Sequence, residues 1–319
     1  MHYILKLLII LFIQFSAVTA MESDQETDIQ RITRELYSVF NSNHYTFLHP
    51  SEEGGAPSSL PQEIFQPKEA GGPSFYSRVG ILPADAIERL RNPKNGEINN
   101  IDCLIATSIC KYALCIHTLG GDEQFNRFSQ NVSVIKEALD CKYSSREFIQ
   151  EVVLGNRAEE DKKLSIDLLF KVSLIDTLDP QKLSPGDIIS IGNDSLYYDR
   201  HPYGKFGAEN VIFYGLNESR EPLFYGFKGI FEDGQPHTLK EIQIAMLEDF
   251  LKEPAVSELY YRFFSPLSAA KNSDIAKRIS SILKLGVAFV ASNICKPRRH
   301  GTFLTEKIER IKIMNEMSL

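Results

Sequence analysis

The sequence predicts an α+β fold, in which helices pack against a small antiparallel sheet. Two observations carry this prediction. Apolar residues recur every three to four positions in much of 24–140 and again after 238, which is typical of amphipathic helices. Between 183 and 230, turn residues separate short runs rich in Ile, Val, Phe and Tyr, which is typical of strands. Because the two kinds of segment are separated along the chain rather than alternating, an antiparallel sheet is favoured over a parallel one.

The composition and net charge of the chain limit the kinds of partner that we expect. The chain has 319 residues, 43% of them hydrophobic and 24% charged, with a net charge of −7. This is ordinary globular composition, long enough for one or two domains. A negative net charge does not favour a broad basic face, so we expect no nucleic-acid partner.

The first twenty residues, MHYILKLLIILFIQFSAVTA, resemble a secretory signal peptide. An apolar run from Leu7 to Phe15 is followed by small residues, with Val18 and Ala20 at the positions that precede a cleavage site. The alternative is an uncleaved membrane anchor, although the run is short for a bilayer span. We therefore predict a signal peptide at 1–20, an exported (periplasmic or secreted) protein and no stable membrane insertion after cleavage.

The rest of the chain divides into three predicted segments. Residues 21–72 hold an amphipathic helix over 24–41 and a Pro/Gly-rich linker without a core of its own. Residues 73–235 form the predicted core domain. Residues 236–319 form a predicted C-terminal helical extension, whose basic tail KPRRHGTFLTEKIERIKI is expected to be a solvated face, with surface adhesion as the alternative.

Within the core, helices are expected to come first. LPADAIERLRNP predicts a short helix that begins at Pro83. Asn99 or Asn100 then offers an N-cap for a buried helix that runs to Leu119 and ends at Gly120-Gly121. A further helix carries an apolar stripe, and 145–176 contain at least one more helical turn; the stripe is Phe125, Phe128, Val132, Ile135 and Leu139.

Strands follow, and then helices again. The segments LSPGDIISIG, ENVIFYG and PLFYGFKGIF predict three strands, the last two joined as a hairpin by LNESRE. A helix is expected from Leu239 to Leu251. A last long helix over NSDIAKRISSILKLGVAFVASNIC is expected to begin at a cap supplied by Asn272 or Ser273.

The five cysteines are an odd number, so at least one thiol is free or intermolecular. Export would permit disulfides, and Cys141 and Cys295 could pair. No Cys-x-x-Cys pattern or Cys/His cluster has the spacing of a zinc site. We therefore expect no structural metal.

Cys103 is the cysteine with a candidate chemical role. If Asn100 caps the buried helix, Cys103 is its third residue, where unpaired backbone N–H groups lower the pKa of a thiol. The alternative is a small buried hydrophobe, which is the expected role of Cys110 and Cys115. Asp102 opposes thiolate formation by its charge.

Glu209 is the second candidate, because it heads a strand that is otherwise apolar. A carboxylate there is costly to bury unless something pairs with it. The alternative is a strand-end glutamate that reaches solvent.

Together these segments resemble a family. A cysteine that opens a buried helix ending TLGGDEQFNRF, then GDIISIG, GAENVIFYG and an aromatic-Gly strand ending KGI, is similar to the bacterial spore-coat type of transglutaminase. That family has a papain-like core related to the NlpC cell-wall peptidases. The resemblance covers Phe75 to Ile230, and its specificity lies in the order and spacing of the segments rather than in one motif.

The resemblance implies a reaction and roles for two residues. A thiolate attacks the carboxamide of a protein glutamine, ammonia leaves, and a lysine amine or water resolves the thioester. Cys103 would be the nucleophile and Glu209 the carboxyl that exchanges protons, with a pKa raised by apolar neighbours. The implied partners are proteins that bear glutamine and lysine, and no metal or organic cofactor is needed.

One departure affects the third catalytic position. The family has a histidine on the strand after the glutamate strand, where this chain has Phe227 or, on another alignment, Tyr225. Phenylalanine cannot carry a proton, and tyrosine is a poor base near neutral pH. The Cys–Glu pair could suffice, His201 could substitute, or catalysis could be lost. The alternative role for His201 is a turn residue, and for His117 a hydrogen-bonded core histidine.

A second departure is the leader, because the spore-coat enzymes act inside the mother cell. Three functions therefore stay open. The first is an exported transglutaminase or glutamine deamidase. The second is an NlpC-type cysteine peptidase or amidase, and the third is a catalytically inactive transglutaminase-like binding protein, since fold resemblance does not establish activity.

Overall fold

The computed structural model describes residues 26–47, 60–67, 75–77, 80–129, 170–201, 204, 206–254 and 269–303. The predicted leader lies outside these residues. So do the later part of the second helical stripe (Val132, Ile135 and Leu139) and Cys141. In the part that is described, no helix is both long and apolar enough to cross a membrane.

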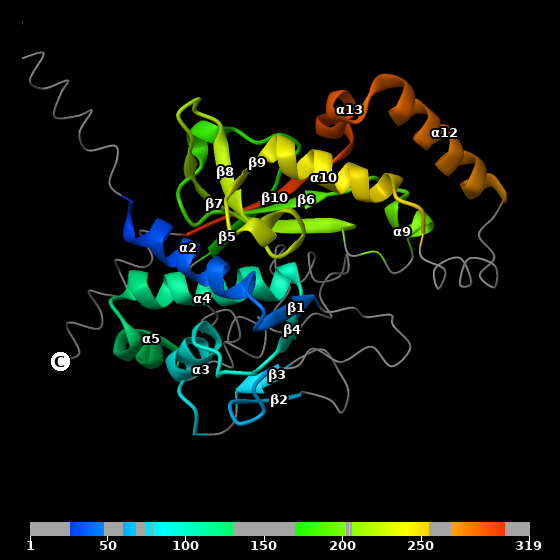
Figure 1. Cartoon of the computed structure of the whole chain (residues 1–319). Helices are drawn as coiled ribbons and strands as arrows, with labels where there is room; N and C mark the ends of the chain where they lie inside the picture. Colours follow the sequence, from blue (N-terminus) through cyan, green and yellow to red (C-terminus); the bar gives the residue numbers. More distant parts are fainter. Residues whose placement is uncertain are drawn as a thin grey trace, which may run out of the picture.

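A six-stranded sheet forms the centre of the molecule, and every neighbouring pair in it is antiparallel. Its strand order is β5-β10-β6-β7-β8-β9, so the strand nearest the C-terminus lies inside the sheet (Figure 1). The strands are β5 (Phe170–Leu174), β6 (Ile188–Gly192), β7 (Ala208–Leu216), β8 (Pro222–Tyr225), β9 (His237–Thr238) and β10 (Lys296–Phe303).

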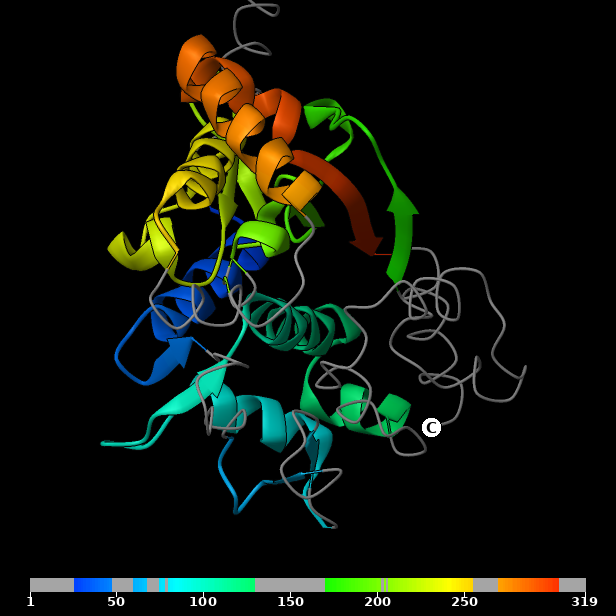
Figure 2. The ribbon, with the colours of Figure 1, turned by 90° about the vertical axis from the view of Figure 1, so that its right-hand side faces the viewer.

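Helices cover both faces of this sheet. On one face lie α2 (Asp28–Phe40) and α4 (Cys103–Leu119), with α3 (Pro83–Arg91) and α5 (Asp122–Ser129) packed behind α4 (Figure 1). On the other face lie α10 (Leu239–Leu251) and α13 (Val287–Ile294), with α12 (Ala269–Leu285) against α13 (Figure 2). The chain combines helices with an antiparallel sheet, so the predicted α+β class is confirmed.

Each face of the sheet has its own hydrophobic core. The core on the α4 side joins α2, α3 and α4 to residues such as Ile212 and Tyr225 of the sheet. The core on the α10 side joins Val211 and Phe213 of β7 to Ile242 and other residues of α10. Successive residues of β7 therefore belong to different cores, as the alternation of side chains along a strand requires.

Local capping explains where two of the helices begin. α2 starts after Thr27, whose hydroxyl accepts from the Gln30 N–H while the Gln30 side chain accepts from the Thr27 N–H. α10 starts with the same reciprocal arrangement between Thr238 and Glu241. Each arrangement satisfies two N–H groups that the helix itself leaves unpaired.

The start of α4 differs from the prediction. Asn99 and Asn100 lie in the short strand β4 (Asn99–Ile101), which pairs in parallel with β1 (Tyr45–Phe47). Asp102 is the N-cap, and its side chain accepts from the Ile105 N–H at 2.7 Å. Cys103 is consequently the first residue of the helix, not the third. The predicted end is confirmed, because Gly120 takes the left-handed conformation (φ 101°) that favours glycine.

The predicted linker includes a small structured element. β2 (Phe65–Pro67) and β3 (Phe75–Ser77) form an antiparallel pair, and Leu60 is buried. Leu60 joins the core on the α4 side. The described part of this segment therefore contributes to the core that the sequence assigned to later residues.

The last predicted helix is two helices. α12 begins at Ala269, before the predicted cap, and the chain breaks at Gly286 before α13. Gly286 has φ 89° and ψ 135°, a conformation that side-chain-bearing residues rarely adopt. The single-helix prediction was wrong because the apolar period continues across this glycine.

The basic tail was also predicted wrongly in its first part. Residues 296–303 form β10, paired with β5 on one side and β6 on the other (Figure 2). Part of the predicted C-terminal helical extension thus belongs to the central sheet. β5 lies near the end of 145–176, where at least one helical turn was expected, and residues 145–169 of that range lie outside the described residues. Two short 3₁₀ helices, Pro180–Lys182 (η4) and Gly229–Asp233 (η5), and the helical turn α9 (Tyr197–Arg200) complete the described elements.

Candidate active site around Cys103

Cys103 lies where the N-terminus of α4 meets β7. α4 packs against β7, and the Thr107 hydroxyl links the two elements. It donates to the Cys103 carbonyl at 2.5 Å and lies 3.3 Å from the Asn210 carbonyl. The first turn of α4 is therefore held against the start of this strand.

The sulfur of Cys103 has two polar neighbours on β7. The Asn210 Nδ2 donates to Sγ at 3.4 Å, and Sγ lies 3.9 Å from the Ala208 carbonyl, to which a thiol can donate. Cys103 is 7% exposed. The sulfur is thus oriented by the strand and nearly closed to solvent.

The pKa of the Cys103 thiol is raised well above its ordinary value. Burial is the largest cause, followed by the charges of Glu209 and Asp102, while the hydrogen bond from Asn210 acts in the opposite direction. We predicted that the helix N-terminus would lower this pKa. In this conformation burial and two neighbouring carboxyls outweigh the helix N-terminus, and the resting group is the thiol.

Glu209 does not reach solvent. It is 2% exposed, and neither carboxyl oxygen has a hydrogen-bond partner in the structure. Burial raises its pKa well above the ordinary value; the nearby N–H of Phe227 offsets part of this, and the charge of Asp102 adds to it. The predicted raised pKa of this carboxyl is consistent with its surroundings, and the solvent-exposed alternative is wrong.

Glu209 and Cys103 are on opposite faces of β7. Glu209 pairs across the sheet with Ile191, which belongs to the core on the α10 side. Asn210, the next residue, faces Cys103. The carboxyl makes no hydrogen bond to the sulfur, although its charge influences the thiol. The structure brings the two predicted residues to adjacent positions of one strand, and not into direct contact.

The position at which the resemblance implies a histidine is part of the core around Cys103. Phe227 is 0% exposed and belongs to the same cluster of packed residues as Cys103. Tyr225 stacks on Tyr37, with ring centroids 5.9 Å apart and planes at 17°, and burial raises its pKa to about 12. Neither side chain can act as a base near neutral pH.

His201 does not join this site. Its ring is buried, its Nε2 lies 3.1 Å from the Phe250 carbonyl, and it packs against Tyr197. It follows α9 directly, in agreement with the structural alternative considered above.

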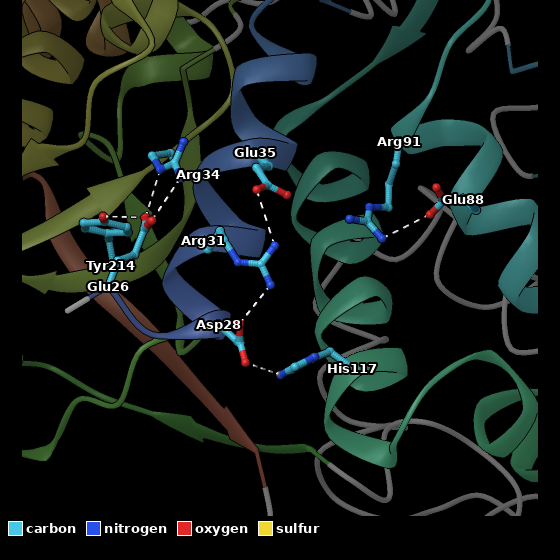
Figure 3. Close-up of polar contacts among 9 residues, drawn as sticks. All are labelled: Glu26, Asp28, Arg31, Arg34, Glu35, Glu88, Arg91, His117 and Tyr214. Carbon is cyan, nitrogen blue, oxygen red and sulfur yellow. Dashed lines mark hydrogen bonds and ion pairs between the residues drawn. The ribbon is translucent and has the colours of Figure 1, made fainter.

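His117 was predicted as a core residue, and this was wrong. It is exposed near the C-terminus of α4, with its Nε2 3.8 Å from the Asp28 carboxylate of α2 (Figure 3). Apolar neighbours in the sequence surround it, but helical rotation turns it outward beside α2. Asp28 also pairs with Arg31, while a separate group of contacts joins Glu26 to Arg34 and Tyr214 (Figure 3).

The other described cysteines are buried and structural. Cys110 and Cys115 are fully buried in the body of α4, and burial raises the pKa of Cys110 to about 12. Cys295 is a free thiol that donates to Asn193 Oδ1 at 3.4 Å, so the considered pairing with Cys141 is not formed. The predicted burial of Cys110 and Cys115 in the body of the helix is confirmed, and their chemical inertness stays a prediction.

Sequence reasoning missed two residues near the thiol. Asn210 follows Glu209 directly, and strand alternation alone would have placed one of the two against α4. Tyr198, 59% exposed, rests against Gly207, and a side chain at that glycine would collide with its phenol ring. Gly207 was the available signal in the sequence, because a glycine at the start of a strand can mark a place where another side chain, here Tyr198, packs closely. Among the described residues, no group of His, Cys, Asp or Glu could hold a metal ion.

Comparison with known proteins gives no match: no family model, no curated protein and no solved structure is similar to this chain.

Replacing Asn210 by alanine is expected to slow alkylation of Cys103 by iodoacetamide at pH 8 by about tenfold. The amide donates the one side-chain hydrogen bond described for the sulfur, and a bond to a charged group contributes about 1.5–3 kcal/mol. Mass spectrometry of the Cys103 peptide measures the rate. Asn217→Ala, in the β7–β8 turn, is the matched control, and equal rates in the two variants would contradict the assignment.

Proposed function

We propose that this chain is an exported, thiol-dependent acyltransferase of the transglutaminase type, built on a papain-like core, with Cys103 as its nucleophile. One observation carries the proposal. The first residue of a buried helix is a cysteine, and it packs on a strand whose adjacent positions hold an amide donor (Asn210) and a buried carboxyl without a hydrogen-bond partner (Glu209).

The acyl-transfer step balances without an external reagent. The sulfur of Cys103 bonds to the carbonyl carbon of a glutamine side chain, the C–N bond breaks, and the thiol proton leaves with the nitrogen as ammonia. An amine then attacks the thioester and returns a proton to the sulfur. Water in place of the amine gives deamidation.

Two donors can stabilise the oxyanion of this step. In the first turn of α4, the Ile105 N–H is taken by Asp102, and the N–H groups that precede it have no partner within the helix. Asn210 Nδ2 already lies at the sulfur and is positioned beside the carbon that the sulfur attacks. The same amide that orients the resting thiol would therefore bind the developing charge.

Glu209 acts as a neutral proton relay in this proposal. A protonated carboxyl can give its proton to the leaving nitrogen through one oxygen while the other oxygen receives the thiol proton. Its raised pKa supplies the protonated form. Because Glu209 faces the α10 side of β7 and makes no hydrogen bond to the sulfur, this role requires its side chain to turn toward α4 when the substrate binds.

The proposed substrates are exported or surface proteins that carry accessible glutamine and lysine side chains. The test is incorporation of a fluorescent primary amine into a glutamine-rich protein by the purified chain and by its Cys103→Ala variant. We expect incorporation by the parent chain and at least a 100-fold loss in the variant, since the nucleophile has no substitute in the described site.

The matched control is Cys110→Ala, a second buried cysteine of the same helix. It is expected to keep the incorporation rate if the protein folds, which circular dichroism establishes. Equal incorporation by Cys103→Ala and the parent would contradict the assignment. Ammonia release without amine incorporation would replace transfer by hydrolysis, and cleavage of cell-wall peptides would replace it by peptidase or amidase activity.

A second candidate function is a binding protein with an inactive site. Phe227 at the position of the family histidine, together with the burial of Sγ, favours it. Absence of incorporation, ammonia release and peptide cleavage in a folded protein would support this candidate.

A further inference from the structure

A cavity of about 300 Å³ lies on the α10 side of the sheet, on the face opposite Cys103. The start of β7, the η5 segment and α10 surround it. Its walls are mainly apolar and include two aromatic rings. These wall residues are Phe206, Ile230, Phe231, Ile242, Ala245 and Met246.

Charged residues occupy the rest of the lining. Three carboxyl residues, Glu209, Glu248 and Asp249, share the cavity with two lysines, Lys228 and Lys252. Small-molecule sites in proteins typically combine apolar walls with a few polar groups in this way.

Both lysines are already engaged. The Lys228 Nζ donates to the carbonyls of Asn41 at 3.1 Å and Ser42 at 2.8 Å, near the C-terminal end of α2. The Lys252 Nζ donates to Asp249 Oδ1 at 2.9 Å, and the other oxygen of Asp249 accepts from the Tyr197 hydroxyl at 2.6 Å. Both lysines and one of the three carboxylates, Asp249, therefore already have polar partners.

Among the charged residues that line the cavity, Glu209 is the buried one whose carboxyl has no hydrogen-bond partner. Both of its oxygens are buried without a hydrogen bond, while Glu248 is exposed. A buried polar group in this state costs free energy, and a cationic donor in the cavity would remove that cost. The remaining requirement is a ligand with a cationic head and an apolar body.

We propose that this cavity binds a short primary alkylammonium ion, with Glu209 as its counter-ion and the apolar walls around its alkyl chain. An ammonium group has three donors, which matches two unsatisfied carboxyl oxygens better than a single donor does. Phe206 and Phe231 line the cavity, and aromatic rings are a class of side chain that attracts cations. The inference shares Glu209 and the amine class of ligand with the proposed acyl transfer and deepens that function, but binding is measured without the thiol and does not depend on Cys103.

Binding is coupled to loss of a proton. The protonated Glu209 carboxyl loses its proton to the buffer when the ammonium ion arrives, and a carboxylate–ammonium pair forms. Asp102 and the Cys103 thiol on the α4 side act on this carboxyl, and Glu248, Asp249, Lys228 and Lys252 share its cavity. The Asp249–Lys252 pair is neutral overall, so the proton lost is assigned to Glu209.

Isothermal titration of the full chain with n-butylammonium chloride tests the proposal. At pH 7, two buffers that differ in ionisation enthalpy give the number of protons released. We expect saturable binding with close to one proton released. Glu209→Gln is expected to weaken binding at least tenfold and to abolish proton release, whereas Glu218→Gln, in the exposed β7–β8 turn, is expected to change neither.

Two further titrations make the test specific. Ala245→Leu is expected to block binding by filling the cavity without changing a charge, and Cys103→Ala is expected to bind as the parent does. Binding of neutral n-butanol as tightly as the amine would overturn the proposal, as would unchanged binding by Glu209→Gln or no heat from the parent. Loss of binding in Cys103→Ala would overturn the independence of this site from the thiol.

Discussion

Replacing Phe227 by histidine is expected to increase the alkylation rate of Cys103 at pH 7 by at least tenfold and to raise amine incorporation with it. Phe227 is part of the core that contains Cys103, on the α4 side of the sheet. An imidazole there can take the thiol proton and remain as a cation, which lowers the pKa that burial and the nearby carboxyls hold high.

The same substitution is expected to lower the free energy of unfolding by a few kcal/mol, because a polar ring enters a fully buried apolar position. Iodoacetamide labelling followed by mass spectrometry measures the reactivity, and urea unfolding measures the stability. Phe227→Leu is the control, since it disturbs the packing without adding a base. If the leucine variant gains as much reactivity as the histidine variant, then the gain comes from loosening of the core.

Replacing Glu209 by glutamine is expected to make the protein more stable than the parent at pH 7 and above, and close to it at pH 4. The pKa of Glu209 is raised in the folded protein, so the folded state holds a proton that the unfolded chain releases above about pH 4.5. Stability of the parent therefore falls as the pH rises above that value. The glutamine variant has no such loss.

The difference between the two proteins is expected to grow by up to about 1.4 kcal/mol per pH unit, until the pH passes the folded pKa of Glu209. Urea unfolding at pH 4, 5, 6, 7 and 8 measures it. The raised pKa of Cys103 affects this comparison only at more alkaline pH. Glu218→Gln is the exposed control, and parallel pH profiles for parent and Glu209→Gln would show that the buried carboxyl is ionised.

Much of the layered arrangement could be predicted because local signals agree with it. Pro83, Gly120 and Thr238 mark helix ends through backbone chemistry that acts over a few residues. The strand pattern of β7 and the turn that joins it to β8 are also signals carried by a few neighbouring residues. The prediction that failed at 296–303 depends on whether a segment finds a distant partner, whereas the one at Gly286 failed because the apolar period continues across a glycine. A polar, basic run such as KPRRH becomes a strand because β5 and β6 lie on either side of it.

The candidate site, too, could be predicted from the sequence only in part. The sequence left open whether Glu209 is buried or reaches solvent, and the structure buries it. The position of Cys103 in the first turn of α4 follows from the pattern of the sequence. Two outcomes do not. Which of Glu209 and Asn210 faces α4 depends on the phase of the strand relative to the helix, and a shift of one residue exchanges them. The direction of the thiol pKa depends on the balance of burial, carboxyls and helix terminus, which only the packed structure fixes.

The position of β10 has a consequence for how this protein acquires its structure during synthesis. β5 and β6 are neighbours along the chain, but each forms hydrogen bonds with a strand made more than a hundred residues later. Until residue 303 has left the ribosome, both strands have open edges, and such edges pair readily with other chains. Contacts of this sequence separation also form slowly. Completion of the sheet is therefore a late event that must await the synthesis of residues 296–303, and a nascent chain that stops before Lys296 would carry two unpaired edges in place of a closed sheet centre.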